Sequence, residues 1–536
     1  MTVIDQMVKL KMSIKKNLPK LVCILAAGIG SRMGEYTAVI NKSLLPINFK
    51  SSLTKIIENF PKDTKFIIAT GFKKENLQNF IKVLGNKNIK IIDVKKYIGP
   101  GSGPAYSLYA CRKYLQKSFY FIPCDTLISE NFPKIEKSNW LGVGITKKPY
   151  HDYCNFLVND KLEITEIFDK IKPKIKSYHN FSGLGYVHDA KTFWKCYKKD
   201  SRIKNYELSI IFNKFIKQKK IIIKKHFWED IGTIEKYKFI KKKYEKYDFS
   251  KINEIIYFEK DKVIKFHTNK KDLENKYKKY LLNPLVFPNI KINNEFLYYD
   301  YIYGKNFYEK AEPKIFRRLL NWCDKKLWKK KIIEKNASFL RACQKFYFDK
   351  THSRLLLFMK NNNYKKDIFN YINNKKIPNI YQLIKKINFE KLYQGVPSYI
   401  HGDLQFDNII ITKNNDFKLI DWRSDFGGLI NIGDLYYDLA KILGGILINY
   451  REIKKNNFYY KNNSSKVFFR LPSSKNKKFL INEFKRFCLK KKLNFEKIEL
   501  MTALIFLNMS PMHKDPFDKI LFCYAKTLIN EKINEN

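Results

Sequence analysis

The sequence predicts two domains of different class, an α/β domain followed by an α+β domain. Its 536 residues exceed what one hydrophobic core usually supports. Between about residues 21 and 243, short apolar runs rich in Ile, Val and Phe alternate with amphipathic stretches, which is typical of a mostly parallel sheet. After about residue 307 the periodicity becomes helical. We therefore expect three parts: 1–19 (a basic extension), 20–248 and 249–536.

The individual elements are expected where apolar runs are bounded by polar or turn residues. Strands of the first domain are predicted at Leu21–Ala26, Lys65–Thr70, Lys90–Val94 and Ser118–Ile122. The second domain begins with two strands and continues with long amphipathic helices, interrupted by a strand-loop-strand unit centred on residues 401–421. These strands are predicted at Ile255–Phe258 and Val263–Phe266, and the helices at Lys314–Trp328, Ala337–Phe358 and Phe479–Lys491. The polar segment Lys454–Lys477 is expected to be an exposed insertion.

The composition limits the possible partners and the compartment. The formal net charge of +53 comes mostly from lysines spread among Asn and Ile residues, the pattern of an AT-rich coding sequence, so we expect no specific nucleic-acid partner. No apolar stretch is long enough to span a membrane, and no secretory signal is recognisable. The nine cysteines include no Cys-x-x-Cys pair, which disfavours a zinc site or a disulfide framework. We expect a cytoplasmic protein with small-molecule substrates; its oligomeric state stays open.

The first functional motif follows the first predicted strand. Leu25 to Met33 read Leu-Ala-Ala-Gly-Ile-Gly-Ser-Arg-Met, in which the glycines let backbone amides approach a triphosphate and Arg32 adds charged hydrogen bonds. A dinucleotide-binding loop is the alternative, but its third glycine is absent because Met33 occupies that place. The continuation through Thr37 to Asn-Lys-Ser-Leu-Leu-Pro at 41–46 makes the pattern more specific.

With this continuation, residues 20–245 resemble the sugar nucleotidyltransferase family, whose pattern has proline where this chain has Asn41. The resemblance implies a Rossmann-like (GT-A-like) mixed sheet and nucleotidyl transfer from an NTP, either CTP or UTP. It assigns catalytic roles to Arg32 and Lys42. It assigns nucleotide binding to Ala26, Ala27, Gly28, Gly30, Ser31, Gly101 and Ser102.

The same resemblance implies metal and acceptor residues further along the chain. Asp125 comes at the carboxyl end of a predicted strand, the edge at which open α/β sheets bind ligands, and it matches a magnesium-binding aspartate. Asp230, in Trp-Glu-Asp-Ile-Gly-Thr at 228–233, matches the second. Lys170 and Gly183 match positions that face the phosphorylated acceptor. Any single acid or lysine among these could be an ordinary surface charge. Because the matching residues occur in the same order as in the family pattern, we expect them to be functional.

The second functional motif lies near the carboxyl end. His401-Gly402-Asp403 is followed by Asn408 and, after a predicted strand, by Asp421-Trp422. Phosphoryl transfer needs a carboxylate that receives the acceptor hydroxyl proton and oxygen ligands for Mg²⁺. Asp403 suits the first role, and Asn408 with Asp421 the second.

This motif resembles the aminoglycoside phosphotransferase and choline kinase family more than the protein kinases. The resemblance implies a bilobal, protein-kinase-like α+β domain that uses ATP and Mg²⁺. It makes Asp403 catalytic and Asn408 and Asp421 metal ligands. It offers Lys265 for the ATP phosphates, and it suggests that Asp434 and Asp438 buttress the loop.

Together the two motifs predict a bifunctional enzyme. The second domain would phosphorylate a small hydroxylated metabolite, a sugar or an amino alcohol such as choline, and the first would convert that phosphate into an NDP-linked donor for surface polysaccharide or lipopolysaccharide synthesis. One alternative is that only one domain is catalytic and the other is a nucleotide-binding regulatory or scaffolding module. An RNA-associated protein is another alternative, disfavoured because no aromatic-basic RNA motif is present.

Overall fold

The computed structural model describes residues 20–128, 137–173, 177–197, 203, 205–244, 254–329, 337–463 and 465–534. The predicted extension 1–19 and the boundary expected at residue 249 lie outside this set. The chain divides into two compact units. The first contains the described residues up to 244 together with Ile255–Thr268 and Asn293–Phe296; the second contains Glu254, Asn269–Ile292 and the described residues from Leu297 onward.

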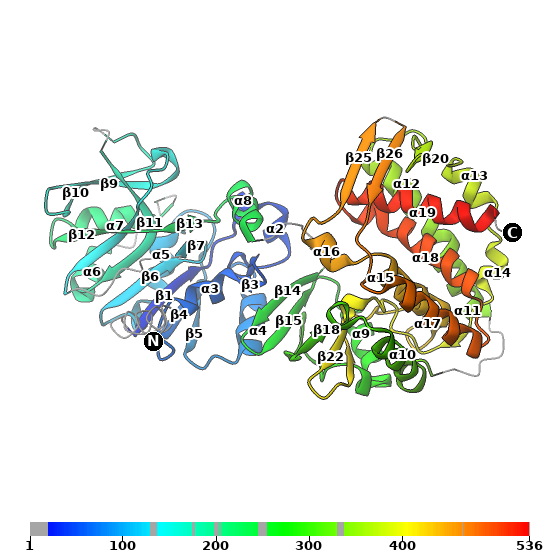
Figure 1. The fold of residues 1–536 in the computed structure, drawn as a ribbon. Coiled ribbons are helices and arrows are strands. Elements are labelled where there is room, and N and C mark those ends of the chain that lie inside the picture. The colour runs from blue at the N-terminus through cyan, green and yellow to red at the C-terminus, as the bar shows by residue number, and fades with distance from the viewer. Residues whose placement is uncertain are drawn as a thin grey trace, which may run out of the picture. The chain divides into compact units, whose positions relative to one another are not determined.

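The first unit is built on a nine-stranded sheet, seen in blue to cyan-green in Figure 1. Its order is β10-β9-β11-β6-β1-β4-β5, and β8 joins β11 to β12. The strands are β1 (Leu21–Ala26), β4 (Lys65–Thr70), β5 (Ile89–Asp93), β6 (Phe119–Pro123), β8 (Asn139–Gly144), β9 (Cys154–Val158), β10 (Ile164–Asp169), β11 (His179–Val187) and β12 (Ile221–His226).

The α/β prediction for this unit is confirmed, and the sheet is mixed. Strands β1, β4, β5 and β6 are parallel neighbours, whereas β11 runs antiparallel to both β6 and β8. Two predicted strands, 21–26 and 65–70, have the bounds observed, and the next two are displaced by one residue. The antiparallel part forms because β9 and β10 pair as direct neighbours without a helical crossover.

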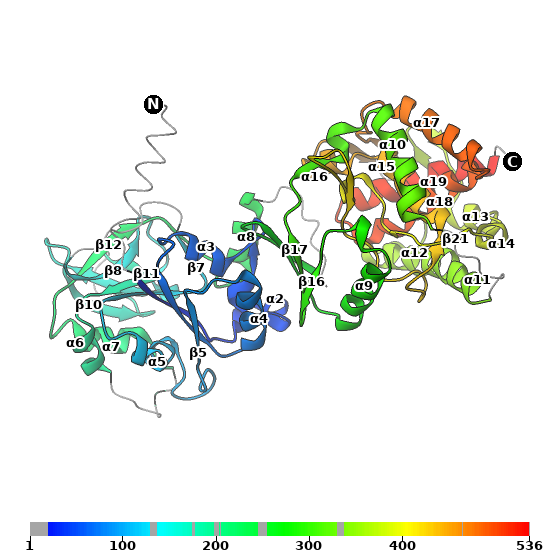
Figure 2. The same cartoon turned by 90° about the horizontal axis from the view of Figure 1, so that it is seen from below.

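Helices cover both faces of this sheet. Figure 2 shows α5 (Pro104–Ala110), α6 (Ala190–Cys196) and α7 (Leu208–Phe215) together on one face, with α3 (Ser52–Glu58) on the other. Beneath the first group lies a core of buried aromatic and aliphatic side chains, among them Phe119, Phe121, Phe193 and Phe212. The sheet is apolar on both faces, as a sheet covered on both sides must be. Also in this unit are α2 (Glu35–Ala38), α4 (Lys74–Leu84) and α8 (Ile234–Tyr244).

Residues 254–300 contain four strands and one helix. The strands are β14 (Glu254–Glu259), β15 (Lys262–His267), β16 (Lys291–Asn293) and β17 (Phe296–Asp300), and the helix is α9 (Lys270–Leu282). The two strands predicted at 255–258 and 263–266 are confirmed by β14 and β15, each one residue longer at both ends.

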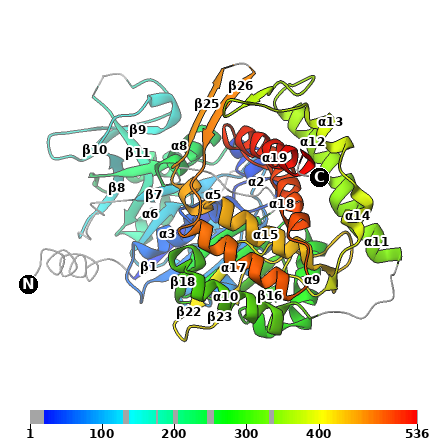
Figure 3. The ribbon, with the colours of Figure 1, turned by 45° about the vertical axis from the view of Figure 1, so that its right-hand side comes forward.

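Helices dominate the second unit. Figure 3 shows α15, α18 and α19 packed side by side. Their bounds and those of the other long helices are α10 (Pro313–Trp322), α11 (Ala337–Gln344), α12 (Lys350–Asn361), α15 (Leu435–Leu447), α17 (Lys477–Lys490), α18 (Phe495–Met509) and α19 (Phe517–Asn534). The predicted helices at 314–328 and 337–358 are present, but each contains a π-helical turn, at Cys323–Leu327 and Lys345–Asp349.

Short strands complete the second unit. β18 (Gly304–Asn306), β22 (Ile409–Thr412) and β23 (Phe417–Leu419) form a three-stranded sheet, which confirms the strand-loop-strand prediction. The described residues of the polar segment 454–477 are mostly exposed or half-buried, in agreement with the predicted exposed insertion, and they contribute the hairpin of β25 (Tyr459–Asn463) and β26 (Lys466–Arg470), anchored by buried Val467. Among the described residues, no helix is long and apolar enough to cross a membrane.

Candidate active sites

The predicted phosphate loop lies at the carboxyl end of β1. Ala26 and Ala27 are buried, and the chain then emerges at Gly28, where an added Cβ would meet no atom within 4 Å. Gly30 has φ of +69°, a left-handed conformation that favours glycine, and its carbonyl accepts from the Met33 amide at 2.8 Å. Ser31 is exposed at the start of the short helical turn that follows. The open space beside Gly28 suits a close ligand contact.

Asn41 joins this loop to the neighbouring strand. Its side-chain amide donates to the carbonyl oxygens of Ala26, at 3.2 Å, and Phe72, at 2.7 Å. Its Oδ1 accepts from the backbone and the hydroxyl of Ser43. Its own backbone has φ of −62° and ψ of 140°. Asn41 thereby fixes the position from which Lys42 extends.

Three residues predicted from sequence converge around Gly232. Asp125 follows β6, and Asp230 ends β13 (Trp228–Asp230), which pairs with β7 (Thr126–Ile128) so that Asp230 lies opposite Thr126. A Cβ added to Gly232 would lie 2.7 Å from Asp230 Oδ1, 3.3 Å from Asp125 Oδ2 and 3.4 Å from Arg32 Nη2. Two carboxylates and a guanidinium therefore face the same small space at the edge of the sheet.

Each carboxylate is neutralised by a lysine. Lys42 Nζ lies 2.6 Å from Asp125 Oδ2; burial opposes the charge of Lys42, but Asp125 raises the pKa of this lysine above its ordinary value. Lys236 Nζ lies 2.9 Å from Asp230 Oδ2, to which the Tyr153 hydroxyl also donates, at 2.8 Å. Burial alone would raise the pKa of Asp230, but these two hydrogen bonds lower it.

The donor set fits Mg²⁺ bound jointly with a substrate. The described residues contain no group of three or more His, Cys, Asp or Glu side chains that could hold a metal. Two carboxylates are nevertheless what Mg²⁺ commonly takes from a protein when phosphate oxygens and water supply the remaining ligands. Asp125 and Asp230 are the residues that would hold it.

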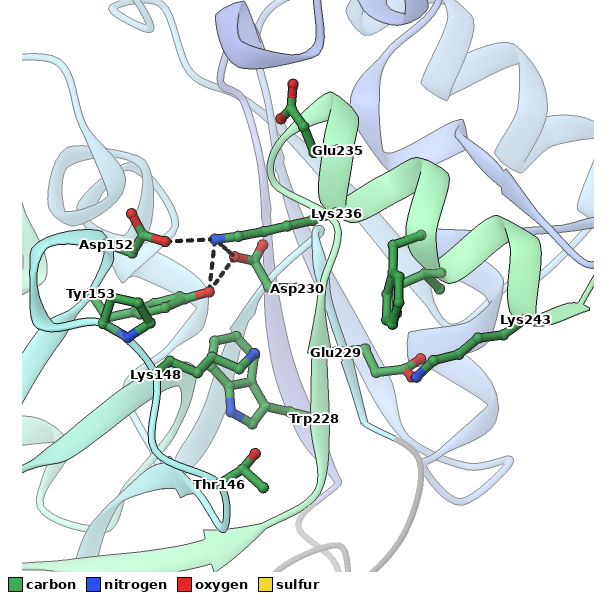
Figure 4. Close-up of a pocket in the computed structure, with 13 residues that line it drawn as sticks. Thr146, Lys148, Asp152, Tyr153, Trp228, Glu229, Asp230, Glu235, Lys236 and Lys243 are labelled. Atoms are coloured by element: carbon green, nitrogen blue, oxygen red, sulfur yellow. Dashed lines mark hydrogen bonds and ion pairs between the residues drawn. The ribbon is translucent and has the colours of Figure 1, made fainter.

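A cavity of about 540 Å³ opens beside Asp230 (Figure 4). Trp228 and Tyr153 line it together with Asp152, Lys148 and Lys236. The Lys148 ammonium lies 3.7 Å from the centre of the Trp228 ring, and burial lowers the pKa of this lysine. The cavity therefore offers both charges and an aromatic wall next to a predicted metal ligand.

The sequence interpretation missed Lys236, Tyr153 and Lys148. In a chain with 104 Lys and Arg residues, a single lysine carries no signal of its own. Lys236 lies near the start of α8, shortly after Asp230 in the sequence. This short separation is the feature that could have pointed to it.

The remaining predicted residues of this unit lie around the same sheet edge but differ in their contacts. Lys170 donates its backbone amide to the carbonyl of Tyr153, while its ammonium pairs with Glu207 at 3.2 Å. Gly183 has φ of +94°, and an added Cβ would lie 2.7 Å from the Pro123 ring, so this site requires glycine. The amides of Gly101 and Ser102 donate to the carbonyls of Ile203 and Gly99, which ties this turn to its own surroundings.

In the second unit, the loop from 401 to 408 brings the predicted catalytic residues together. The Asp403 carboxylate uses its two oxygens differently: Oδ1 lies 2.9 Å from Lys441 Nζ, and Oδ2 lies 3.4 Å from the Asn408 side-chain amide. Asn408 also donates to the Asp403 carbonyl at 2.8 Å. Lys441, on α15, is a further residue that the sequence interpretation missed.

Two backbone hydrogen bonds bring the Asp421 segment to this loop. The Ile420 amide donates to the Asn408 carbonyl at 2.9 Å, and the Arg423 amide donates to the His401 carbonyl at 3.0 Å. Asp421 lies between them with φ of +60°. Asn408 and Asp421 therefore offer oxygen atoms from adjacent strand ends, which suits Mg²⁺.

His401 is a structural residue with a defined tautomer. Burial lowers its pKa to about 3, so the ring is neutral. Its Nδ1 accepts from the Asp403 amide at 3.2 Å, which leaves Nε2 to donate to the Ile420 carbonyl at 3.0 Å. Through these two hydrogen bonds the ring joins the loop to the end of β23.

Asp438 supports the loop from below. Its carboxylate accepts from the backbone amides of His401 and Gly402, each at 2.7 Å, and from Trp328 Nε1 at 3.0 Å. Asp434 accepts similarly from Val396, Tyr436 and Tyr347. Burial raises the pKa of both acids, that of Asp438 to about 6. These contacts are the buttressing role predicted for the two residues.

We expect Asp438→Ala to destabilise the second unit strongly. The substitution leaves three buried donors without an acceptor, and each such group costs about 1–3 kcal/mol. Urea titration followed by tryptophan fluorescence should show a lower midpoint, because Trp328 and Trp422 are buried in this unit. Exposed Glu390→Ala is the control and should change nothing. Equal midpoints for the two variants would contradict the role given to Asp438.

Lys265 lies buried on β15, in the segment that belongs to the first compact unit. Its assignment to the ATP phosphates stays a prediction from the sequence.

Residues 22–132 match the model of the MobA-like NTP transferase domain. This match supports the nucleotidyltransferase prediction for the residues that it covers. No curated protein matches the chain.

Among solved structures, the chain is similar to a putative glucose-1-phosphate thymidylyltransferase from Bacillus anthracis, with 21% identity and a TM-score of 0.36 over 43% of this chain and 98% of the other. It is similar to the inositol-1-phosphate CTP transferase from T. maritima, with 17% identity and a TM-score of 0.35 over 42% and 96%. It is also similar to the CTP:phosphocholine cytidylyltransferase from Streptococcus pneumoniae, with 18% identity and a TM-score of 0.34 over 41% and 97%.

Proposed function

We propose that the chain is a bifunctional enzyme. The second unit phosphorylates a small hydroxylated metabolite with ATP, and the first transfers a nucleotidyl group from CTP or UTP to the resulting phosphate and releases pyrophosphate. The NDP-linked product would serve surface polysaccharide or lipopolysaccharide synthesis. The observation that carries the nucleotidyl step is the convergence of Arg32, Asp125 and Asp230 around Gly232, with Lys42 bound to Asp125.

In the nucleotidyl step, an oxygen of the acceptor phosphate attacks the α-phosphate of the NTP, and pyrophosphate leaves. Arg32 and Lys42 offset the negative charge that builds up there. Mg²⁺, when bound, would screen the triphosphate and stabilise the leaving group. Asp125 and Asp230 would hold the metal, while Lys42 and Lys236 offset the repulsion between the two carboxylates in its absence.

In the kinase step, the acceptor hydroxyl attacks the γ-phosphate of ATP, and ADP leaves. Asp403 orients the hydroxyl and receives its proton. Lys441 and Asn408 contact different oxygens of the Asp403 carboxylate, and Asn408 and Asp421 would hold a Mg²⁺. The support for this step is the loop geometry of Asp403 and Asn408 together with the family resemblance.

The test of the two-step reaction uses the kinase's own product. The intact chain, given ATP, Mg²⁺ and a panel of hydroxylated acceptors, should form phosphorylated products identifiable by mass. Each product is then offered to the same protein with CTP or UTP, and pyrophosphate release is measured. We expect at least one product to be converted. If none is converted by any NTP, the two activities do not form a sequence.

A regulatory or scaffolding second unit is the alternative. It predicts ATP binding without turnover of any acceptor, and it leaves the close contact of Lys441 with Asp403 without a chemical purpose.

A further inference from the structure

The second unit carries four cationic side chains beside Asp403, here named the basic cluster: Lys350, Arg354, Arg423 and Lys441. Lys350 and Arg354 lie one turn apart on α12, so their side chains share a face of that helix. Arg423 follows Asp421, and its Nε donates to the Gly402 carbonyl at 3.4 Å, which places it against the catalytic loop. Lys441 contacts Asp403 directly.

The basic cluster has few carboxylates to balance it. Lys441 is paired with Asp403, but among the described residues neither Lys350, Arg354 nor Arg423 forms an ion pair with a carboxylate. Tyr437, Asp403 and Asp425 favour the charged form of Arg423 electrostatically, and Asp403 also acts on Lys350, so Asp403 is shared among several cations. Gathering cations in a partly buried place is unfavourable unless an anion joins them. The imbalance thus points to a negatively charged ligand.

Two observations indicate that the fold holds the cations of the basic cluster together. The ammonium of Lys350 lies 4.1 Å from the centre of the Phe346 ring, and the guanidinium of Arg423 lies 5.2 Å from the same ring, so one aromatic side chain supports both. Burial, followed by the positive charges of its cluster neighbours, lowers the pKa of Lys350 well below its ordinary value. An anion bound here would relieve that repulsion.

Lys441 of the basic cluster and Asn408 approach Asp403 at different oxygens. Asn408, the proposed metal ligand, contacts Oδ2 of this carboxylate, whereas Lys441 contacts Oδ1. The other three cations interact electrostatically with each other or with Lys441. Lys441, and with it the basic cluster, therefore lies at the oxygen of Asp403 that the proposed metal ligand Asn408 does not contact.

We propose that the acceptor phosphorylated by the second unit is an anion, a hydroxylated compound bearing a phosphate or carboxylate group that the basic cluster binds, and not a choline-like cation. This rests on the proposed kinase function, which supplies the hydroxyl acceptor; the anion preference follows from the charges. Phosphoryl transfer then proceeds as described above, from ATP to the acceptor hydroxyl with its proton going to Asp403.

Calorimetric titration of the full chain tests the proposal. The protein is saturated with Mg²⁺ and a non-hydrolysable ATP analogue at physiological salt and titrated with glycerol 3-phosphate, glycerate or choline. We expect at least one of the two anions to bind and choline not to bind. Lys350→Met and Arg354→Met should each lower the affinity for the anion roughly 10- to 100-fold, the effect of losing a hydrogen bond to a charged group. Lys350→Arg should restore most of the affinity. Exposed Lys360→Met, on the same helix, is the matched control and should bind like the parent.

Each outcome of the titrations supports or contradicts the proposal of an anionic acceptor. Binding of choline in place of the anions, equal anion binding by Lys350→Met and Lys360→Met, or no anion binding would overturn the proposal. A loss of affinity for the ATP analogue, with anion affinity intact, would assign the basic cluster to the nucleotide and overturn it as well. If the anion binds through Lys350 but no hydroxylated anion is phosphorylated, the anion site stands and the kinase function fails. If choline alone is phosphorylated, the kinase function stands and the anion proposal fails.

Discussion

Asp403→Asn should lower ATP-dependent phosphorylation by ~10² or more, because a positioned acid-base group contributes roughly 10²–10⁴ to the rate. Asparagine keeps the shape of the side chain and its contact with Asn408, but it cannot accept the proton of the acceptor hydroxyl, and its ion pair with Lys441 is lost. Release of pyrophosphate from a supplied phosphorylated acceptor should persist, since that reaction is proposed for the first unit. Both rates are measured on the same preparation.

Asp416→Asn provides the control for this substitution. Asp416 lies on the exposed turn between β22 and β23 and pairs with the surface residue Lys326, at 3.3 Å. Its replacement should leave both activities unchanged. A folded Asp403→Asn protein that loses both activities equally would show that the sites are not separate, and one with full kinase activity would remove Asp403 from the mechanism.

Asp125→Asn and Asp230→Asn should each reduce Mg²⁺-dependent pyrophosphate release to background while phosphorylation continues. The carboxylates converge on Gly232, and a neutral amide is a poor ligand for Mg²⁺. Because each carboxylate is bound to a lysine, the substitutions remove an ion-pair partner from Lys42 or from Lys236, which keeps Asp152 at 3.2 Å, so we also expect a modest loss of thermal stability. The measurement is pyrophosphate release across a Mg²⁺ titration.

Asp160→Asn is the matched control, because Asp160 is exposed in the turn between β9 and β10. It should release pyrophosphate like the parent at every Mg²⁺ concentration. Either site variant that keeps normal turnover at limiting Mg²⁺ would show that its aspartate is not a metal ligand.

The strands and loops that were predicted correctly are those whose pattern lies within one short segment of the chain. β1 and β4 are nearly uninterrupted apolar runs, and the glycines and charged residues after β1 lie together in one short segment. The antiparallel pairing of β9, β10 and β11 was not predicted, because strand direction depends on which neighbours pair and not on the pattern within a strand.

The missed residues of the candidate sites have a common cause. Lys236, Tyr153 and Lys441 each reach a predicted aspartate from a separate element of the fold. Only Lys236 lies close in sequence to its aspartate; for Tyr153 and Lys441 no spacing within the chain predicts the contact, and the abundance of lysine obscures the lysine contacts further. The aspartates could be found because short motifs surround them; the groups that neutralise them could be found only once the chain was folded.

The backbone at Asn41 has the torsion that a proline ring would impose, with φ of −62°. A proline there would keep the path of the chain but would leave the carbonyls of Ala26 and Phe72 without their amide donor. Proline and asparagine can thus produce the same backbone turn. Proline does so through its ring, and Asn41 through hydrogen bonds to the ends of two strands. Because either residue fits the torsion before Lys42, a search for distant relatives should match backbone geometry at this corner and tolerate both.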